Sequence, residues 1–191
     1  SLEKDTIGGF NSLINKQKKQ DGEVLVSTVL FNDSSVVIHD RKPIDEVRLM
    51  TNKDYEVYGC TALLDALGSS IRHIGNIHKY ARIEDVPEHT MFVIITDGME
   101  NASRYYSKER VKSMIEYEKE KYGWEFLFLA ANMDAIDTAS QYGIDKDHAV
   151  NYQCDSVGTR LNYEVLDEAI QCICSGVPLS KSWKSKIEKR K

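Results

Sequence analysis

The sequence predicts an α/β fold, in which a doubly wound, mostly parallel sheet has one antiparallel edge strand and helices on both faces. Residues 91–95 are five apolar residues in a row, typical of a parallel strand that is buried on both sides. From Thr61 onward helical and strand patterns alternate, which is the order that gives a parallel sheet. Earlier in the chain, residues 24–31 and 35–40 flank the turn residues 32–34 and predict a hairpin, which would supply the antiparallel edge strand.

The helices are predicted from apolar residues that recur three or four positions apart. In the first helix this stripe includes Ile7, Phe10 and Ile14, and the pair Gly8-Gly9 inside it indicates close packing against a neighbour, because glycine otherwise weakens a helix. Four further helices are expected, beginning near Thr61, Ser107, Asp134 and Asp155 or Ser156. A second buried strand is expected over residues 124–130 and a short strand over residues 148–152.

Length and composition favour one globular domain over residues 1–176, followed by a basic tail over residues 177–191. The chain has 191 residues, of which 41% are apolar and 29% charged. The tail holds six lysine and arginine residues against one glutamate, and we expect it to be a solvated terminus. Because the chain has a net charge of −5 and the tail contributes +5, residues 1–176 carry a net charge of −10, and binding to nucleic acid is not expected.

The chain contains no segment that predicts contact with a membrane. No apolar run approaches the roughly 20 residues that a membrane helix needs, and the first residues do not show the charged-then-apolar pattern of a signal peptide. We therefore expect a soluble, cytoplasmic protein.

Three predicted loops should meet at one edge of the sheet, where ligands bind in open α/β folds. They are residues 58–61, 96–101 and 132–134. Thr61 offers a hydroxyl, and Asp97 and Asp134 offer carboxylates, which are the hard oxygen donors that magnesium and calcium prefer. Each residue also has an ordinary alternative role, since Thr61 and Asp134 can cap helices and the pair Asp97-Gly98 can close a turn.

The sequence Gly-Cys-Thr-Ala-Leu-Leu-Asp-Ala-Leu at 59–67, followed by Val-Ile-Ile-Thr-Asp-Gly at 93–98, resembles a von Willebrand factor type A (VWA) domain. The resemblance extends from the first helix to about Gly176, implies a Rossmann-like sheet, and is closest to bacterial stand-alone VWA proteins, including those associated with tellurium resistance. The family builds a metal-ion-dependent adhesion site from three loops. The resemblance implies that Thr61 and Asp97 are ligands of Mg²⁺, Asp97 through a water.

The resemblance further implies a non-enzymatic, protein-binding module. In the family, a carboxylate of the protein partner completes the coordination of the metal. Around Thr61 and Asp97 we expect a contact surface for such a partner. Its residues are Tyr58, Gly59, Gly98, Met99, Glu100, Asn101 and Asp134.

The sequence departs from the VWA pattern in its first loop. An Asp-x-Ser-x-Ser motif should precede the helix that contains Ile7, and the motif occurs nowhere in the sequence. Three expected ligands are then missing, so magnesium binding should be weak or undetectable. The central strand between residues 24–31 and 91–95 is missing as well, and unpaired backbone groups in a core are costly. We expect the strand to have been lost by truncation; the alternatives are a sheet that closes up or a strand from another chain in a homo-oligomer.

A phosphotransfer or hydrolytic enzyme with Asp97 as its nucleophile is the alternative function. Against it, Met99 stands where a second carboxylate is expected, and neither glycine-rich phosphate motif is present. The five histidines are scattered and the G-x-S-x-G motif of serine hydrolases is absent. The sequence therefore favours a binding module over an enzyme.

Overall fold

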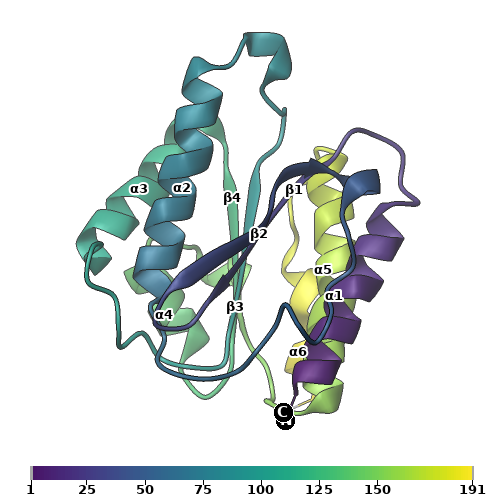
Figure 1. Cartoon of the computed structure of the whole chain (residues 1–191), viewed down its shortest axis with the longest axis vertical. Coiled ribbons are helices and arrows are strands. Elements are labelled where there is room, and N and C mark those ends of the chain that lie inside the picture. The colour runs from purple at the N-terminus through teal and green to yellow at the C-terminus, as the bar shows by residue number, and fades with distance from the viewer. Residues whose placement is uncertain (1, 191) are drawn as a thin grey trace. The chain divides into compact units, whose positions relative to one another are not determined.

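The computed structural model of the protein describes residues 2–190 and has the predicted α/β class (Figure 1). The chain divides into two compact units. The first unit runs to Gly59 and resumes at Tyr152, and the second is Cys60–Asn151. Within the described residues, no helix is both long and apolar enough to cross a membrane.

Each unit contains one sheet and its own helices. The elements of the first unit are α1 (Glu3–Gln17), β1 (Leu25–Phe31), β2 (Ser35–Pro43), the 3-10 helix η1 (Ile44–Glu46), α5 (Ser156–Cys174), η4 (Lys181–Lys184) and α6 (Ser185–Glu188). The elements of the second are α2 (Leu63–Tyr80), η2 (Ile83–Asp85), β3 (Met91–Thr96), α3 (Lys108–Tyr122), β4 (Glu125–Ala130), α4 (Ala135–Gln141), η3 (Lys146–His148) and β5 (Ala149–Asn151).

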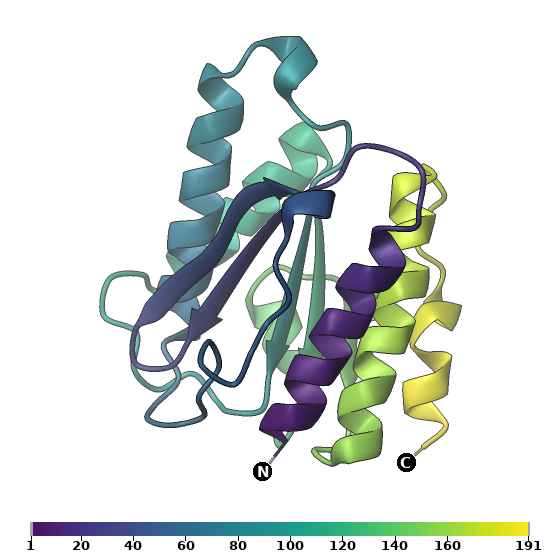
Figure 2. The same cartoon turned by 45° about the vertical axis from the view of Figure 1, so that its right-hand side comes forward.

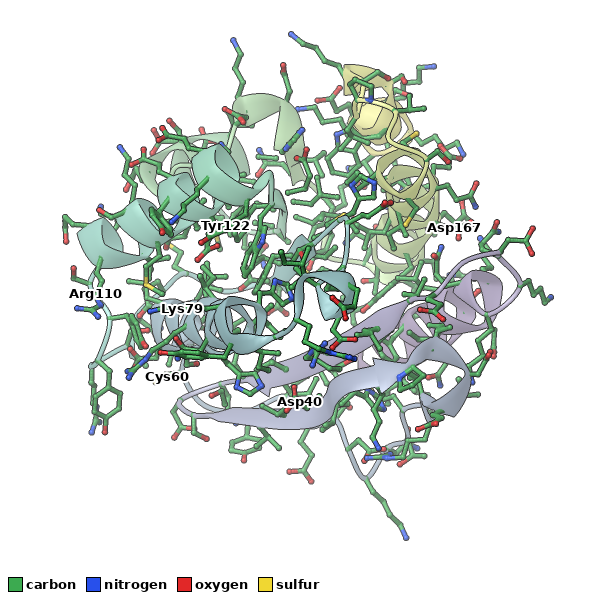
Figure 3. The ribbon with its side chains drawn as sticks, turned by 90° about the horizontal axis from the view of Figure 1, so that it is seen from above. Asp40, Cys60, Lys79, Arg110, Tyr122 and Asp167 are labelled. Carbon is green, nitrogen blue, oxygen red and sulfur yellow. The ribbon has the colours of Figure 1, made fainter. Side chains whose placement is uncertain are left out.

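In the first unit, α1 lies alongside α5, although the two helices come from opposite ends of the chain (Figures 1 and 2). Gly9 faces the ring of Tyr163 so closely that a β-carbon at this position would overlap the ring. The prediction of close packing at the glycine pair is thus confirmed for Gly9. Polar contacts also join the helices, since Gln17 Nε2 donates to Asp167 Oδ1 at 2.8 Å; Asp167 is labelled in Figure 3.

The predicted hairpin is confirmed, but it forms a sheet of its own. β1 and β2 pair antiparallel, and the Asn32 side chain accepts a hydrogen bond from the N–H of Ser34 at 2.9 Å in the turn. The prediction that this hairpin would be the edge of a mostly parallel sheet is corrected, since β1 and β2 pair only with each other in the described residues.

The basic tail is not the solvated terminus that the sequence predicts. Trp183 and Ile187 are buried, and η4 and α6 pack against α5. The guanidinium of Arg190 pairs with both carboxylate oxygens of Asp155 at 2.8 and 2.7 Å. Asp155 also caps α5 through the N–H of Gly158, and the Arg190 guanidinium lowers the pKa of Asp155 to about 2. Two apolar side chains spaced four residues apart explain the difference, because they give α6 and η4 a face to bury.

The second unit contains the predicted alternation of helices and parallel strands. Its sheet has the order β3-β4-β5, with residues 91–96 in continuous register with 125–130. β4 lies in the middle, and its residues 126–130 are almost completely buried. On one face the rings of Phe92, Trp124 and Phe126 stack, with Phe92 at 5.5 Å from Trp124 and 5.2 Å from Phe126. α2 and α3 lie side by side (Figures 1 and 2).

The predicted beginnings of α3 and α4 are confirmed. The Ser107 hydroxyl accepts a hydrogen bond from the N–H of Arg110, and α3 ends at Gly123 in the left-handed conformation at φ 66°. Asp134 caps α4 by accepting from the N–H of Asp137 at 3.0 Å. These caps fix where the helices begin and end, and hence where the loops at the carboxyl ends of the strands lie.

A buried carboxylate lies on α3 at Glu118. Its Oε2 has no hydrogen-bond partner within the described residues, and Gly75 on α2 leaves the space that its Oε1 occupies. Burial raises the pKa of Glu118, with an opposing effect of Lys121. The ionised carboxylate therefore destabilises the fold, because a buried charge without a full set of partners is costly.

We expect Glu118→Gln to stabilise the protein at neutral pH. Since the folded-state pKa is raised, the wild-type carboxyl favours folding at low pH, and this contribution is lost as the pH rises through the folded-state pKa. The free energy of unfolding of Glu118→Gln, relative to wild type, should thus increase from pH 4 to pH 8 in urea titrations. Glu120→Gln, at an exposed position of the same helix, is the control. If the free energies of unfolding of Glu118→Gln and wild type change in parallel with pH, the pKa of Glu118 is not raised by burial.

Candidate functional site

The candidate site lies in the second unit, where the loops after β3 and before α2 are fastened together. The backbone N–H of Thr61 donates to Asn101 Oδ1 at 2.8 Å. In return, the carbonyl of Thr61 accepts from the N–H groups of Asn101 and Ala102 at 3.0 and 3.3 Å. These reciprocal bonds explain why two loops far apart in sequence have one fixed geometry. Two of the three predicted loops are therefore brought together.

The Thr61 hydroxyl lies next to the Asp97-Gly98 turn. A β-carbon added to Gly98 would stand 2.8 Å from Thr61 Oγ1, so only glycine leaves room for the hydroxyl at this distance. The hydroxyl does not cap α2, whose N-cap is Ala62, without a side-chain cap. The Asp97 side chain is exposed. Within residues 2–190 neither Thr61 Oγ1 nor the Asp97 carboxylate has a hydrogen-bond partner, so both oxygen donors are free to bind a ligand.

Glu100 holds the loop rather than pointing outward. Its carboxylate accepts hydrogen bonds from the N–H groups of Leu64, Ala102 and Ser103 at 2.9, 3.0 and 2.8 Å, and from the Ser103 hydroxyl at 2.8 Å. The bond to Leu64 satisfies a backbone donor at the N-terminus of α2, where negative charge is favoured. Glu100 thus supplies the cap that was expected from Thr61 as its ordinary alternative role.

Asp65 fastens the continuation of the same loop. Its two carboxylate oxygens accept from the N–H groups of Arg104, Tyr105 and Tyr106 at 2.8, 2.9 and 2.8 Å. Although partial burial acts to raise it, these three donors lower the pKa of Asp65. Sequence reasoning did not find this role. The available signal was an acidic residue in the first turn of a helix, which does not reveal a partner 40 residues away.

The third predicted loop reaches the site through Asn132. This residue adopts the left-handed conformation at φ 60°, and its Nδ2 donates to the carbonyl of Asp97 at 3.1 Å. The prediction that the loops after β3 and β4 meet at one edge of the sheet is confirmed by this bond. The carboxylate of Asp134 accepts from Asp137 as a helix cap, which confirms its ordinary alternative role.

The remaining predicted contact residues differ in their surroundings. Met99 is 67% exposed and lies between Asp97 and the Glu100 contacts. Tyr58 and Gly59 belong to the first unit, where Tyr58 is exposed and Gly59 has a left-handed φ of 84° near the side chains of Asn32 and Asp33. The site in the second unit is therefore built from Thr61, Asp97 and their neighbours alone.

A hydroxyl and a carboxylate suit a hard cation such as Mg²⁺, which is usually held by one or two carboxylates and several waters. The second unit provides Thr61 Oγ1 and Asp97 as such donors, with the carbonyls around them engaged in loop bonds. In the described residues, no group of three or more His, Cys, Asp or Glu is placed to hold a metal ion. The chemistry of the two donors fits Mg²⁺, and their number predicts weak binding.

No family model matches this chain, and no curated protein matches it. The VWA resemblance remains a prediction that is based on residues 59–67 and 93–98.

Proposed function

We propose that the protein is a non-enzymatic, protein-binding module of the VWA type, with an incomplete metal-ion-dependent adhesion site at Thr61 and Asp97. The observation that carries the proposal is the position of the Thr61 hydroxyl against Gly98, the residue that follows exposed Asp97, whose carboxylate has no hydrogen-bond partner among residues 2–190. The carboxylates of Glu100 and Asp65 in the same loops are taken up by backbone N–H groups, whereas the Asp97 carboxylate is exposed to solvent. Two free donors on a rigid frame are instead suited to a ligand.

In this proposal the protein partner supplies a carboxylate to a cation held by Thr61 and Asp97. A bound divalent cation would attract such a carboxylate, and the partner's oxygen would add to a ligand set that is short of protein donors. The rigid loop around Glu100 and Asp65 limits the entropy that would be lost on binding. Exposed Met99 provides an apolar contact beside the charged centre. The cytoplasmic location expected from the sequence belongs to the same proposal.

Titration with Mn²⁺ tests the metal site, because a bound paramagnetic ion broadens NMR signals near it. We expect the amide signals of Thr61, Asp97 and Gly98 to broaden first. Thr61→Val and Asp97→Asn should weaken this effect by at least about tenfold, since even indirect partners of a metal ligand contribute about 10–100-fold to affinity. Mg²⁺ should compete with Mn²⁺ for the same signals.

Asp134→Asn is the matched control, because it changes a carboxylate of the same sheet edge that caps α4. On addition of Mn²⁺, the amide signals of this variant should broaden as those of wild type do. Broadening that is centred on other carboxylates, or that persists unchanged in Asp97→Asn, would contradict the proposed site.

The phosphotransfer alternative rests on one observation, the exposed carboxylate of Asp97 at the end of β3. A nucleophilic aspartate would form an acyl phosphate, so incubation with acetyl phosphate should add the mass of a phosphoryl group at this residue. The binding-module proposal expects no such adduct. A stable adduct that is lost in Asp97→Asn would favour the enzyme instead.

A further inference from the structure

The hairpin of the first unit buries an ionisable side chain. His39 on β2 is 4% exposed, whereas the other residues of β1 and β2 are partly or fully exposed. Its ring is parallel within 3° to the ring of Phe10 on α1, with the ring centroids 6.2 Å apart. Phe10 packs in turn against a cluster of buried residues, Ile14, Ile44 and Val47. An imidazole thus occupies a position of the hairpin where an apolar side chain is more usual.

Only one ring nitrogen of His39 has a hydrogen-bond partner among residues 2–190. Nδ1 lies 3.0 Å from Oγ1 of Thr28, the residue opposite His39 on β1, and Nε2 is buried without a partner. The register of the hairpin shifts on both sides of this pair, and Arg41 has a left-handed φ of 46°. Such irregularities re-aim the side chains of a strand. A second ring proton would leave a buried N–H without an acceptor, which is costly.

The surroundings of the ring oppose its protonation. Burial is the largest cause that lowers the pKa of His39, and the charge of Arg48 is the next. The Arg48 backbone and Asp54 act in the opposite direction, and Lys42 lowers the pKa slightly further. Asp54 is itself taken up by the Arg48 guanidinium, at 2.9 and 2.7 Å. β1 has no ionisable side chain, and α1 meets the ring through Phe10.

We propose that His39 is a pH-sensitive switch, whose neutral ring holds the β1–β2 hairpin against α1 and whose protonation in mild acid releases the hairpin. Because the folded-state pKa is lowered, the hairpin loses stability as the pH falls below 6.5, the ordinary pKa of histidine. Hydrogen bonds from Arg48 hold the pKa of Asp54 well below its usual range, and that of Asp155 is about 2. These two carboxylates therefore stay charged where His39 responds.

The second unit responds to acid in the opposite direction. Burial raises the pKa of Glu118, so the contribution of this carboxyl to stability increases as the pH falls. Mild acid therefore opens the first unit while the second keeps its structure. The proposal is independent of the metal site, since it uses neither Thr61 nor Asp97.

Amide hydrogen exchange of the full chain, followed by NMR between pH 7 and pH 5, tests the proposal. Each rate is divided by the intrinsic exchange rate at the same pH, so that it reports the opening of the structure. Below pH 6.5, the opening constant of β1 and β2 should rise by up to about tenfold per pH unit, the limit for the uptake of one proton. The amides of β4 should show no such rise.

His39→Gln keeps a neutral polar side chain and should remove the acid-induced opening of the hairpin. His89→Gln, at an exposed position of the second unit, is the matched control and should leave the opening unchanged. The ring signals of His39 in the wild type give a readout that needs no variant, and their titration midpoint should lie below pH 6.5.

Three results would overturn the proposal. The first is a titration midpoint of the His39 ring at or above pH 6.5. The second is acid-induced opening of the hairpin that persists unchanged in His39→Gln. The third is a parallel rise in the opening of β4, because acid then acts on the whole chain rather than on the contact between the hairpin and α1.

Discussion

Replacing Glu100 by alanine should lower the free energy of unfolding by about 2–4 kcal/mol. Its carboxylate accepts four hydrogen bonds, and a bond to a charged group contributes about 1.5–3 kcal/mol net. The total is smaller than the sum because water can reach some of the freed donors in this partly buried loop. The donors at Leu64, Ala102 and Ser103 would lose their partner at once. The loop that carries Asp97 would then lose its fixed geometry. Urea unfolding measures the stability, and the NMR signals of residues 97–103 report the loop.

Met99→Ala is the matched control for this experiment, because its side chain is exposed and adjacent in sequence. Its effect should stay within about 0.5 kcal/mol, as is usual for surface positions. Glu100→Gln keeps the shape but loses the negative charge, and should lie between alanine and wild type. If Glu100→Ala is as stable as Met99→Ala, the loop does not depend on this carboxylate.

The glycine pair of α1 should show opposite responses to alanine. Gly9→Ala should destabilise the protein by about 3 kcal/mol, because the new β-carbon overlaps the ring of Tyr163 and overpacking costs about 1–3 kcal/mol or more. Gly8→Ala, one position earlier, meets no atom within 4 Å and should stabilise by about 0.5–1 kcal/mol, since alanine favours a helix over glycine.

Thermal and urea unfolding of these two variants measure the contact between α1 and α5 directly. Both variants replace a glycine of α1 by alanine. The difference between their free energies of unfolding therefore reports the contact with the ring of Tyr163 alone. Equal effects at both positions would show that α1 does not pack on α5 through Gly9. The variant Tyr163→Leu should reduce the cost of Gly9→Ala, because the clashing ring is then removed.

Much of the fold could be predicted because its signals are local. The apolar run of β3, the turn at Asn32 and the caps at Ser107 and Asp134 each depend on a few neighbouring residues, and all are present in the structure. Pairing between distant strands depends on which backbones meet, which local patterns do not encode. For this reason the separate hairpin sheet was missed. The buried tail was missed although the spacing of Trp183 and Ile187 is a local signal for a helix with an apolar face.

In the candidate site, too, some features could be predicted from the sequence and others could not. The topology of a parallel sheet predicted that loops after successive strands converge, and the bond from Asn132 to Asp97 confirms this. The roles of Glu100 and Asp65 could not be predicted, because a carboxylate that binds backbone N–H groups has the same sequence appearance as an exposed one. The role of Asp134 could be predicted, because a helix cap depends on neighbouring residues only. Capping was one of the two roles expected for this residue.

The discontinuous first unit has a consequence for synthesis on the ribosome. The second unit is one continuous segment, Cys60–Asn151, and its contacts can form as soon as that segment emerges. α1 must instead wait for α5, as the bond between Gln17 and Asp167 spans 150 positions. At about 5–20 residues per second, the wait is roughly 8–30 s. During this time the apolar face of α1 is available to chaperones, and the N-terminal helix is among the last elements to acquire its native contacts.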